Sequence, residues 1–214
     1  MNLGKIYILG DSYSTYEGCV PQGYDCYYAN EIKRDTDVCR QSETWWQQLL
    51  NKTGAELLEN NSYSGTTIGN TGYNGAYCPK TSFIGRFSAE LQSGAFSAKQ
   101  PNTVLIFGGT NDFWAGAPLG KLQFENWTDE DLKCTLPAFC CLLHTVKQAF
   151  LKAKIVVIIN DLFSPELTLG LKQGCEAYQV PFVALRNIKK QGGHPNKVGM
   201  TQIFEQLYHR LENC

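Results

Sequence analysis

KIYILGDS, at residues 5–12, is a short apolar run that ends in a polar turn. An apolar run without alternation is typical of a parallel strand that is covered on both faces. Similar runs follow at residues 55–59, 104–107, 155–159 and 180–185, and the one at 55–59 is the weakest. We therefore expect a parallel sheet of five strands.

Three segments between these runs repeat apolar residues at three- and four-residue steps, as expected for helices that bury one side. They are marked by Trp45, Leu49 and Leu50; by Leu136, Phe139, Leu143, Val146 and Phe150; and by Met200, Ile203, Phe204, Leu207 and Leu211. Ser42 is the expected N-terminal cap of the first helix. Strands that alternate with helices predict an α/β fold, here a single three-layer α/β/α domain over residues 1–214.

Two connections are unusually long, at residues 10–42 and 60–82. Long structureless connections in a compact domain are usually lids or binding loops. Ligands of a parallel sheet bind beyond the carboxyl ends of its strands. We therefore expect loops 13–42 and 62–82 to lie over the functional site.

The composition argues against several classes of protein. With 214 residues, of which 43% are hydrophobic and 18% charged, the chain can bury a sizeable core. A net charge of −1 makes nucleic acid an unexpected partner, and no apolar run approaches the roughly 18 residues of a membrane span. Since the first strand begins at Lys5, there is no room for a secretory signal, which predicts a cytoplasmic protein unless a secreted chain was trimmed.

Nine cysteines leave three interpretations open. The favoured one is reduced structural thiols, and the second is a disulfide among the loop cysteines Cys19, Cys26, Cys39 and Cys78. A metal site is the third, but there is no CxxC pair and the three histidines are far apart in the sequence. We expect no metal and, since GxGxxG and GxxxxGK[ST] are both absent, no cofactor.

Polar turns follow two of the expected strands. Gly10-Asp11-Ser12 comes directly after the first strand, and Gly108-Gly109-Thr110-Asn111-Asp112 comes after the third. Both turns are expected at the same edge of the sheet, where Ser12 could act as a nucleophile and Asn111 could donate an amide N–H. Taken singly, each is equally well explained as an ordinary polar turn.

Two further segments carry polar chemistry. Gly65, in the segment after the second strand, can present an unobstructed backbone N–H. His194 precedes Pro195, which pre-sets the start of the last helix and so keeps the histidine on the loop. His144 and His209 lie inside helical patterns and are expected to be ordinary surface or core residues.

These four segments, in this order, resemble the four sequence blocks of the SGNH (GDSL-like) hydrolase/esterase superfamily. The resemblance extends from Ile6 to about Leu211, and it implies a flavodoxin-like sheet in the strand order 2-1-3-4-5. It also implies a serine esterase in which His194 takes the proton of Ser12 as the hydroxyl attacks an ester carbonyl. The Ser12 N–H, the Gly65 N–H and the Asn111 side chain would then bind the oxyanion.

One position departs from the family pattern, which places an aspartate three residues before the histidine. This chain has Gln191 there, whose amide oxygen could orient His194 but carries no charge. Three explanations are open: a Ser–His dyad oriented by a backbone carbonyl, a carboxylate from elsewhere, or an impaired enzyme. Asp161, at the end of the fourth strand, is the candidate carboxylate.

Aromatic residues crowd the N-terminal half and the expected loops, and aromatic rings above a polar site often stack on sugars. We therefore expect the substrate to be a short acyl ester, such as an O-acetyl group on a carbohydrate. The residues expected to line the substrate site are Asp11, Tyr13, Thr66, Gly109, Asp112 and Trp114. Trp45 and Trp46 are also explained by packing of the first helix against the sheet.

Other functions remain open at this point. They are a catalytically impaired carbohydrate-binding protein of this fold, a lipase, lysophospholipase or thioesterase, and a flavin- or nucleotide-binding α/β protein. Ser64, beside Gly65, is an alternative nucleophile, although it lacks the GxSxG context of α/β-hydrolases.

Overall fold

The computed structural model describes residues 1–31, 34–97 and 100–213. Five parallel strands form one sheet in the order β2-β1-β3-β4-β5. They are β1 (Lys5–Gly10), β2 (Glu56–Ser62), β3 (Thr103–Phe107), β4 (Lys154–Ile159) and β5 (Phe182–Ala184). The expected α/β fold and its flavodoxin-like strand order are confirmed.

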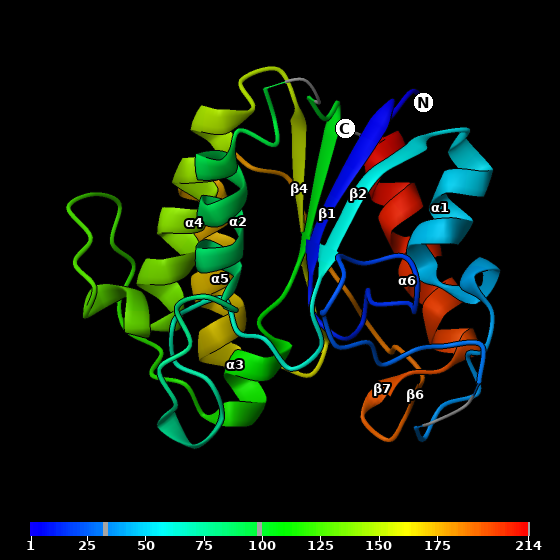
Figure 1. Cartoon of the computed structure of the whole chain (residues 1–214), viewed down its shortest axis with the longest axis horizontal. Coiled ribbons are helices and arrows are strands. Elements are labelled where there is room, and N and C mark those ends of the chain that lie inside the picture. The colour runs from blue at the N-terminus through cyan, green and yellow to red at the C-terminus, as the bar shows by residue number, and fades with distance from the viewer. Residues whose placement is uncertain (32–33, 98–99, 214) are drawn as a thin grey trace.

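Helices cover both faces of the sheet (Figure 1). On one face lie α1 (Trp45–Thr53) and α6 (Lys197–Glu212), and on the other lie α2 (Phe83–Ser93), α4 (Thr135–Ala149) and α5 (Pro165–Ala177). In β1, Ile6 and Ile8 join the core under the first pair, while Tyr7 and Leu9 join the core under the other three. Because both faces are buried, β1, β3 and β4 are apolar at nearly every position after their first residue.

Short elements complete the chain at the carboxyl ends of the strands. They are η1 (Gln41–Glu43), η2 (Tyr73–Gly75), α3 (Thr110–Ala115), η3 (Asp131–Lys133), β6 (Lys190–Gln191) and β7 (His194–Pro195). β6 and β7 pair as an antiparallel hairpin directly before α6.

The structure differs from the sequence-based expectations at three places. Ser42 does not cap α1, because it lies within η1, and the side chain of Thr44 accepts the bond from Gln47 N instead. β2 continues to Ser62, beyond its expected end. The apolar pattern did not reveal this extension, because the last three residues of β2 are polar but buried. The patterns did not specify α2 and α5, which begin after the capping serines Ser82 and Ser164.

The eight described cysteines are free thiols, and Cys214 lies outside the described residues. Among the helices that the structure describes, none is long and apolar enough to cross a membrane.

A buried arginine joins the carboxyl ends of β1 and β2. Arg86, on α2, is only 2% exposed. Its Nη2 donates to Gly10 O at 3.1 Å and to Thr66 Oγ1 at 3.2 Å, and its Nη1 donates to Asn61 O at 2.6 Å. Its Nε donates to Thr81 O at 2.9 Å. Backbone carbonyls of two strands and a loop therefore surround this charge.

We expect Arg86→Met to lower the free energy of unfolding by about 3 kcal/mol, because each buried acceptor left without a donor costs about 1–3 kcal/mol. Urea unfolding measures the change. Arg186→Met, at an exposed position, is the control and is expected to stay within about 0.5 kcal/mol of the wild type. Equal unfolding midpoints for the two variants would show that the guanidinium does not hold the strand ends.

Candidate active site

Ser12 and His194 meet at the carboxyl edge of the sheet, where the loop after β1 reaches the β6–β7 hairpin (Figure 1). Ser12 follows β1 and is 2% exposed, and His194 begins β7. The distance between Ser12 Oγ and His194 Nε2 is 2.9 Å. These residues are 182 positions apart in the chain, so the contact depends on the whole fold.

The other ring nitrogen of His194 faces a backbone carbonyl, with 3.2 Å between Nδ1 and Gly192 O. Gly192 and Gly193 have φ angles of 54° and 80°, in the left-handed region that favours glycine. This backbone conformation turns the Gly192 carbonyl back toward the imidazole of its own hairpin. The geometry matches the first of the three explanations for the missing aspartate.

The two candidate orienting side chains have other partners. Asp161 pairs with Lys190 and accepts a hydrogen bond from Ile188 N at 2.7 Å. Gln191 Nε2 donates to Asp35 Oδ1 at 2.7 Å. Within the described chain, neither forms a hydrogen bond with His194.

Three aromatic rings surround the imidazole. Tyr27 stacks on it with 3.5 Å between ring centroids and an angle of 8°, while Tyr13 and Trp114 lie at 5.4 and 5.3 Å. Burial lowers the pKa of His194 to about 4, and Arg34 acts in the same direction, against the hydrogen bond with Gly192 O. The imidazole is therefore neutral over most of the physiological pH range.

Gly65 and Asn111 lie near the same edge. Gly65 is exposed, has a φ of 80°, and has open space where a Cβ would be, so the backbone conformation is what favours glycine here. Among the described residues, neither Ser12 N nor Gly65 N has a hydrogen-bond acceptor. Asn111 Nδ2 donates to Thr66 O at 2.9 Å, and its Oδ1 accepts from Tyr73 OH at 2.9 Å.

The two aspartates of the polar turns point into the protein. Asp112 accepts hydrogen bonds from Ile68 N at 2.9 Å and from Thr135 Oγ1 at 3.2 Å, and Asp11 accepts from Tyr13 N at 3.0 Å. Burial raises the pKa of Asp11 to about 7 and that of Asp112 to about 6. Both carboxyl groups therefore stabilise the loops by accepting hydrogen bonds from buried backbone N–H groups.

Of the other residues that were expected to line the substrate site, three are buried and one is exposed. Tyr13 and Thr66 are buried, and Tyr13 OH donates to Gly193 O at 2.6 Å. Gly109 is also buried, with a φ of 96° beside the ring of Phe163. Trp114 is the exposed member, at 37%.

Trp45 and Trp46 are core residues, as packing of the first helix predicted. They also have a second role, because their indole N–H groups donate to Tyr13 O at 3.1 Å and to Ser14 O at 3.0 Å. Helix α1 thus holds the loop that carries Ser12.

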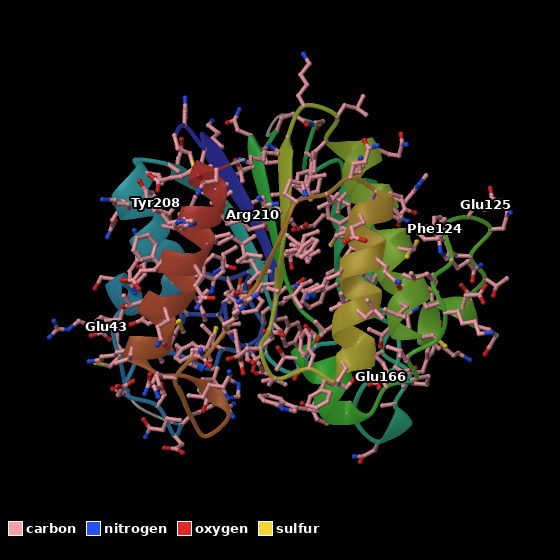
Figure 2. The ribbon with its side chains drawn as sticks, turned by 180° about the vertical axis from the view of Figure 1, so that it is seen from behind. Glu43, Phe124, Glu125, Glu166, Tyr208 and Arg210 are labelled. Carbon is pink, nitrogen blue, oxygen red and sulfur yellow. The ribbon has the colours of Figure 1, made fainter. Side chains whose placement is uncertain are left out.

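Glu43, labelled in Figure 2, anchors the far end of the same loop. Its Oε2 accepts from Cys39 N at 2.9 Å, and its Oε1 lies 3.0 Å from Lys197 Nζ at the start of α6. The loop after β1 is therefore tied to α6, the helix that directly follows the histidine hairpin.

Tyr27 and Tyr73 were expected only as members of the aromatic group in the loops, without a specific role, and Arg86 was not predicted. Their contacts with His194, Asn111 and the strand ends join distant segments, and only the abundance of tyrosine in the loops pointed toward the first two. Ser64, the alternative nucleophile, donates its N–H to Asp25 O at 2.9 Å. Its hydroxyl forms no hydrogen bond with a histidine in the described part of the chain.

Comparison with known proteins identifies one family. Residues 4–211 match the GDSL-like Lipase/Acylhydrolase family. A proposed GDSL-like lipase from Bacteroides ovatus is 36% identical, with a TM-score of 0.93 and 100% of both chains covered. Another from Bacteroides uniformis is 39% identical, with a TM-score of 0.90 and coverage of 99% of this chain and 96% of that one.

A more distant similarity is one of fold alone. An acetyl xylan esterase from the rumen bacterium Butyrivibrio proteoclasticus is 18% identical, with a TM-score of 0.63 and coverage of 100% of this chain and 64% of that one. Curated proteins gave no match.

We expect Asp161→Asn and Gln191→Ala each to change the rate of ester hydrolysis by no more than a few-fold, since the side chains of Asp161 and Gln191 bond other partners among the described residues. Initial rates with an aryl acetate measure the effect, and circular dichroism controls for folding. A loss of about 10⁴-fold, the size of an Asp-to-Asn change in a Ser-His-Asp triad, would identify the altered residue as the one that orients His194.

Proposed function

We propose that this chain, which belongs to the GDSL-like lipase/acylhydrolase family and is an ester hydrolase, forms an acyl-enzyme on Ser12 with His194 as general base. The observation that carries the proposal is the 2.9 Å distance between Ser12 Oγ and His194 Nε2. A serine hydroxyl is a weak nucleophile near neutral pH and needs a base at this distance. The carbonyl of Gly192 favours the tautomer with hydrogen on Nδ1, which leaves Nε2 free to accept the proton.

The first half of the reaction transfers the acyl group to Ser12. His194 takes the hydroxyl proton as Oγ bonds to the ester carbonyl carbon, and the carbonyl oxygen becomes an oxyanion. The free N–H groups of Ser12 and Gly65 and the amide of Asn111 are the donors for that oxygen. The imidazolium then gives its proton to the leaving alkoxide as the C–O bond breaks.

The second half uses water in place of the alcohol. His194 takes a proton from water, the hydroxide attacks the acyl carbon, and Ser12 leaves with the proton that His194 returns. The acyl group departs as a carboxylic acid, and the resting dyad is restored.

The substrate we propose is an acetyl ester on a carbohydrate. Exposed rings stand beside the buried Ser12: Trp114 lies against His194, and Tyr73 donates a hydrogen bond to Asn111. Flat exposed aromatic rings suit the apolar faces of sugars. The fold similarity to an acetyl xylan esterase supports the same substrate class.

The substrate proposal is tested with an aryl acetate, a long-chain aryl ester and an acetylated xylo-oligosaccharide. We expect acetate release from the first and third, slow turnover of the second, and labelling of Ser12 by a fluorophosphonate. Ser12→Ala should lose the label and about 10⁶-fold in kcat.

Two results would contradict different parts of this proposal. Equal turnover of acetyl and long-chain esters, with no acetate from the oligosaccharide, would exclude the substrate class. An unlabelled wild type that binds the oligosaccharide without hydrolysing any ester would exclude the mechanism and indicate a carbohydrate-binding protein.

The pH dependence of kcat/KM follows from the lowered pKa of His194. Only the neutral imidazole can act as the base, and it predominates above a pKa of about 4 rather than the ordinary 6.5. We therefore expect kcat/KM to stay nearly constant from neutral pH down to about pH 5 and then to fall. Initial rates on enzyme shown to be folded at each pH provide the measurement, and a half-maximal value near pH 6.5 would contradict the expectation.

A further inference from the structure

The hydrogen bonds to His194 do not by themselves fix the orientation of its imidazole ring. Nδ1 has one acceptor, Gly192 O at 3.2 Å, and Nε2 contacts Ser12 Oγ. In the proposed mechanism, Ser12 Oγ carries the acyl group during the second half-reaction, so this contact is not available to hold the ring. A further contact is needed to keep Nε2 aimed at the reacting oxygen.

Tyr27 makes such a contact. Its ring lies on the imidazole with 3.5 Å between centroids and an angle of 8°, which is nearly parallel. Parallel stacking opposes tilting of the imidazole out of its plane, whereas the Gly192 bond fixes the direction within that plane. Together, the two contacts define the orientation that a carboxylate would otherwise set.

Tyr27 is itself fixed to the nucleophile loop. Its N–H donates to Thr15 Oγ1 at 2.9 Å, and Thr15 Oγ1 donates to Ser12 O at 3.0 Å. At the other end of the ring, Tyr27 OH donates to Asp35 O at 3.0 Å. The contacts thus run from Ser12 through Thr15 and Tyr27 to His194 and back to Ser12.

We propose that Tyr27 is a positioning residue that replaces the missing aspartate, with its ring holding the His194 imidazole in the orientation that general-base catalysis requires. The inference rests on the proposed function of the Ser12–His194 pair.

The Tyr27 ring also borders a cavity whose described lining does not include His194. Tyr27 lines a cavity of about 600 Å³ together with Glu17, Asp25 and Arg34. One face of Tyr27 is covered by the imidazole, so the cavity borders its other face or its edge.

Within the described part of the chain, the imidazole is faced by Ser12, Tyr13, Tyr27 and Trp114, and Gly192 O lies beside its Nδ1. Arg34 is the charged group that acts on His194, and it lies 5.7 Å from the centre of the Tyr27 ring. Asp35 is engaged by Gln191. Removal of the Tyr27 ring admits water to the imidazole and thereby favours its charged form.

The test compares Tyr27→Ala and Tyr27→Phe with the wild type. Tyr27→Ala is expected to lower kcat about 10²-fold, the size of effect that misplacement of a reacting group produces. KM should change only a few-fold, because Tyr27 acts through His194. The acid limb of kcat/KM should move upward from near pH 4 toward 6.5. Tyr27→Phe keeps the ring and should remain within a few-fold of the wild type.

Tyr24→Ala is the matched control. Tyr24 belongs to the same loop, and its described ring contacts are with Tyr63, at 4.5 Å between centroids, and with Arg86, rather than with His194. We expect wild-type kcat and an unmoved acid limb. If Tyr27→Ala does not fold by circular dichroism, Tyr27→Leu, which keeps apolar bulk without a flat ring, undergoes the same measurements.

A readout independent of activity comes from the ¹⁵N chemical shifts of His194, one of three histidines in the chain. We expect one tautomer, with hydrogen on Nδ1, in the wild type and in Tyr27→Phe, and a mixture in Tyr27→Ala. Wild-type kcat, acid limb and tautomer in Tyr27→Ala would overturn the inference, as would an equal loss in Tyr27→Phe. A wild type without esterase activity or Ser12 labelling would instead overturn the proposed function, and the tautomer of His194 would still decide the role of Tyr27.

Discussion

The guanidinium of Arg86 fixes the edge of the sheet on which the candidate catalytic groups depend. β1 and β2 pair as far as Gly10 and Ser62, and just beyond that point Tyr63 N donates to Gly10 O at 3.1 Å. Arg86 extends the connection by donating to Gly10 O and Asn61 O and to the hydroxyl of Thr66, next to Gly65. The spacing between Ser12 and Gly65 is therefore set by a side chain from a helix.

The burial of this charge illustrates how the site is built. A guanidinium has five N–H donors in a rigid plane and can bond several carbonyls at once, which offsets the cost of removing it from water. Trp45 and Trp46 act on the same principle from the opposite face of the sheet, with buried rings and N–H groups that bond the Ser12 loop. Large buried side chains of the helices thus donate hydrogen bonds to the irregular backbone of the loops.

Much of the fold could be predicted from the sequence, because burial on both faces leaves long apolar runs at the strands. The placement of Ser12 and Asn111 followed from the rule that strand ends share one edge, whereas the pairing of His194 with Ser12 followed from the family resemblance. The cap of α1 could not be assigned from local sequence, since Ser42 and Thr44 are equally suited and the preceding turn decides between them. Asp11 and Asp112 were expected to line the substrate site, and only the folded loops show that backbone and hydroxyl donors draw them inward. No repeating pattern in the sequence marks the stacking of Tyr27 on His194, so this contact could not be predicted.

In the proposed mechanism, the two hydrogen bonds of Asn111 have a consequence for the energetics of turnover. With Oδ1 bound by Tyr73 and one N–H bound by Thr66 O, the amide has a single orientation, and its remaining hydrogen is aimed before any ligand arrives. The entropy of ordering this donor is lost once, when the chain folds, and not again in each catalytic cycle. A dipole that is preorganised in this way requires no reorientation as negative charge develops, which is the condition under which it stabilises a transition state more than a ground state.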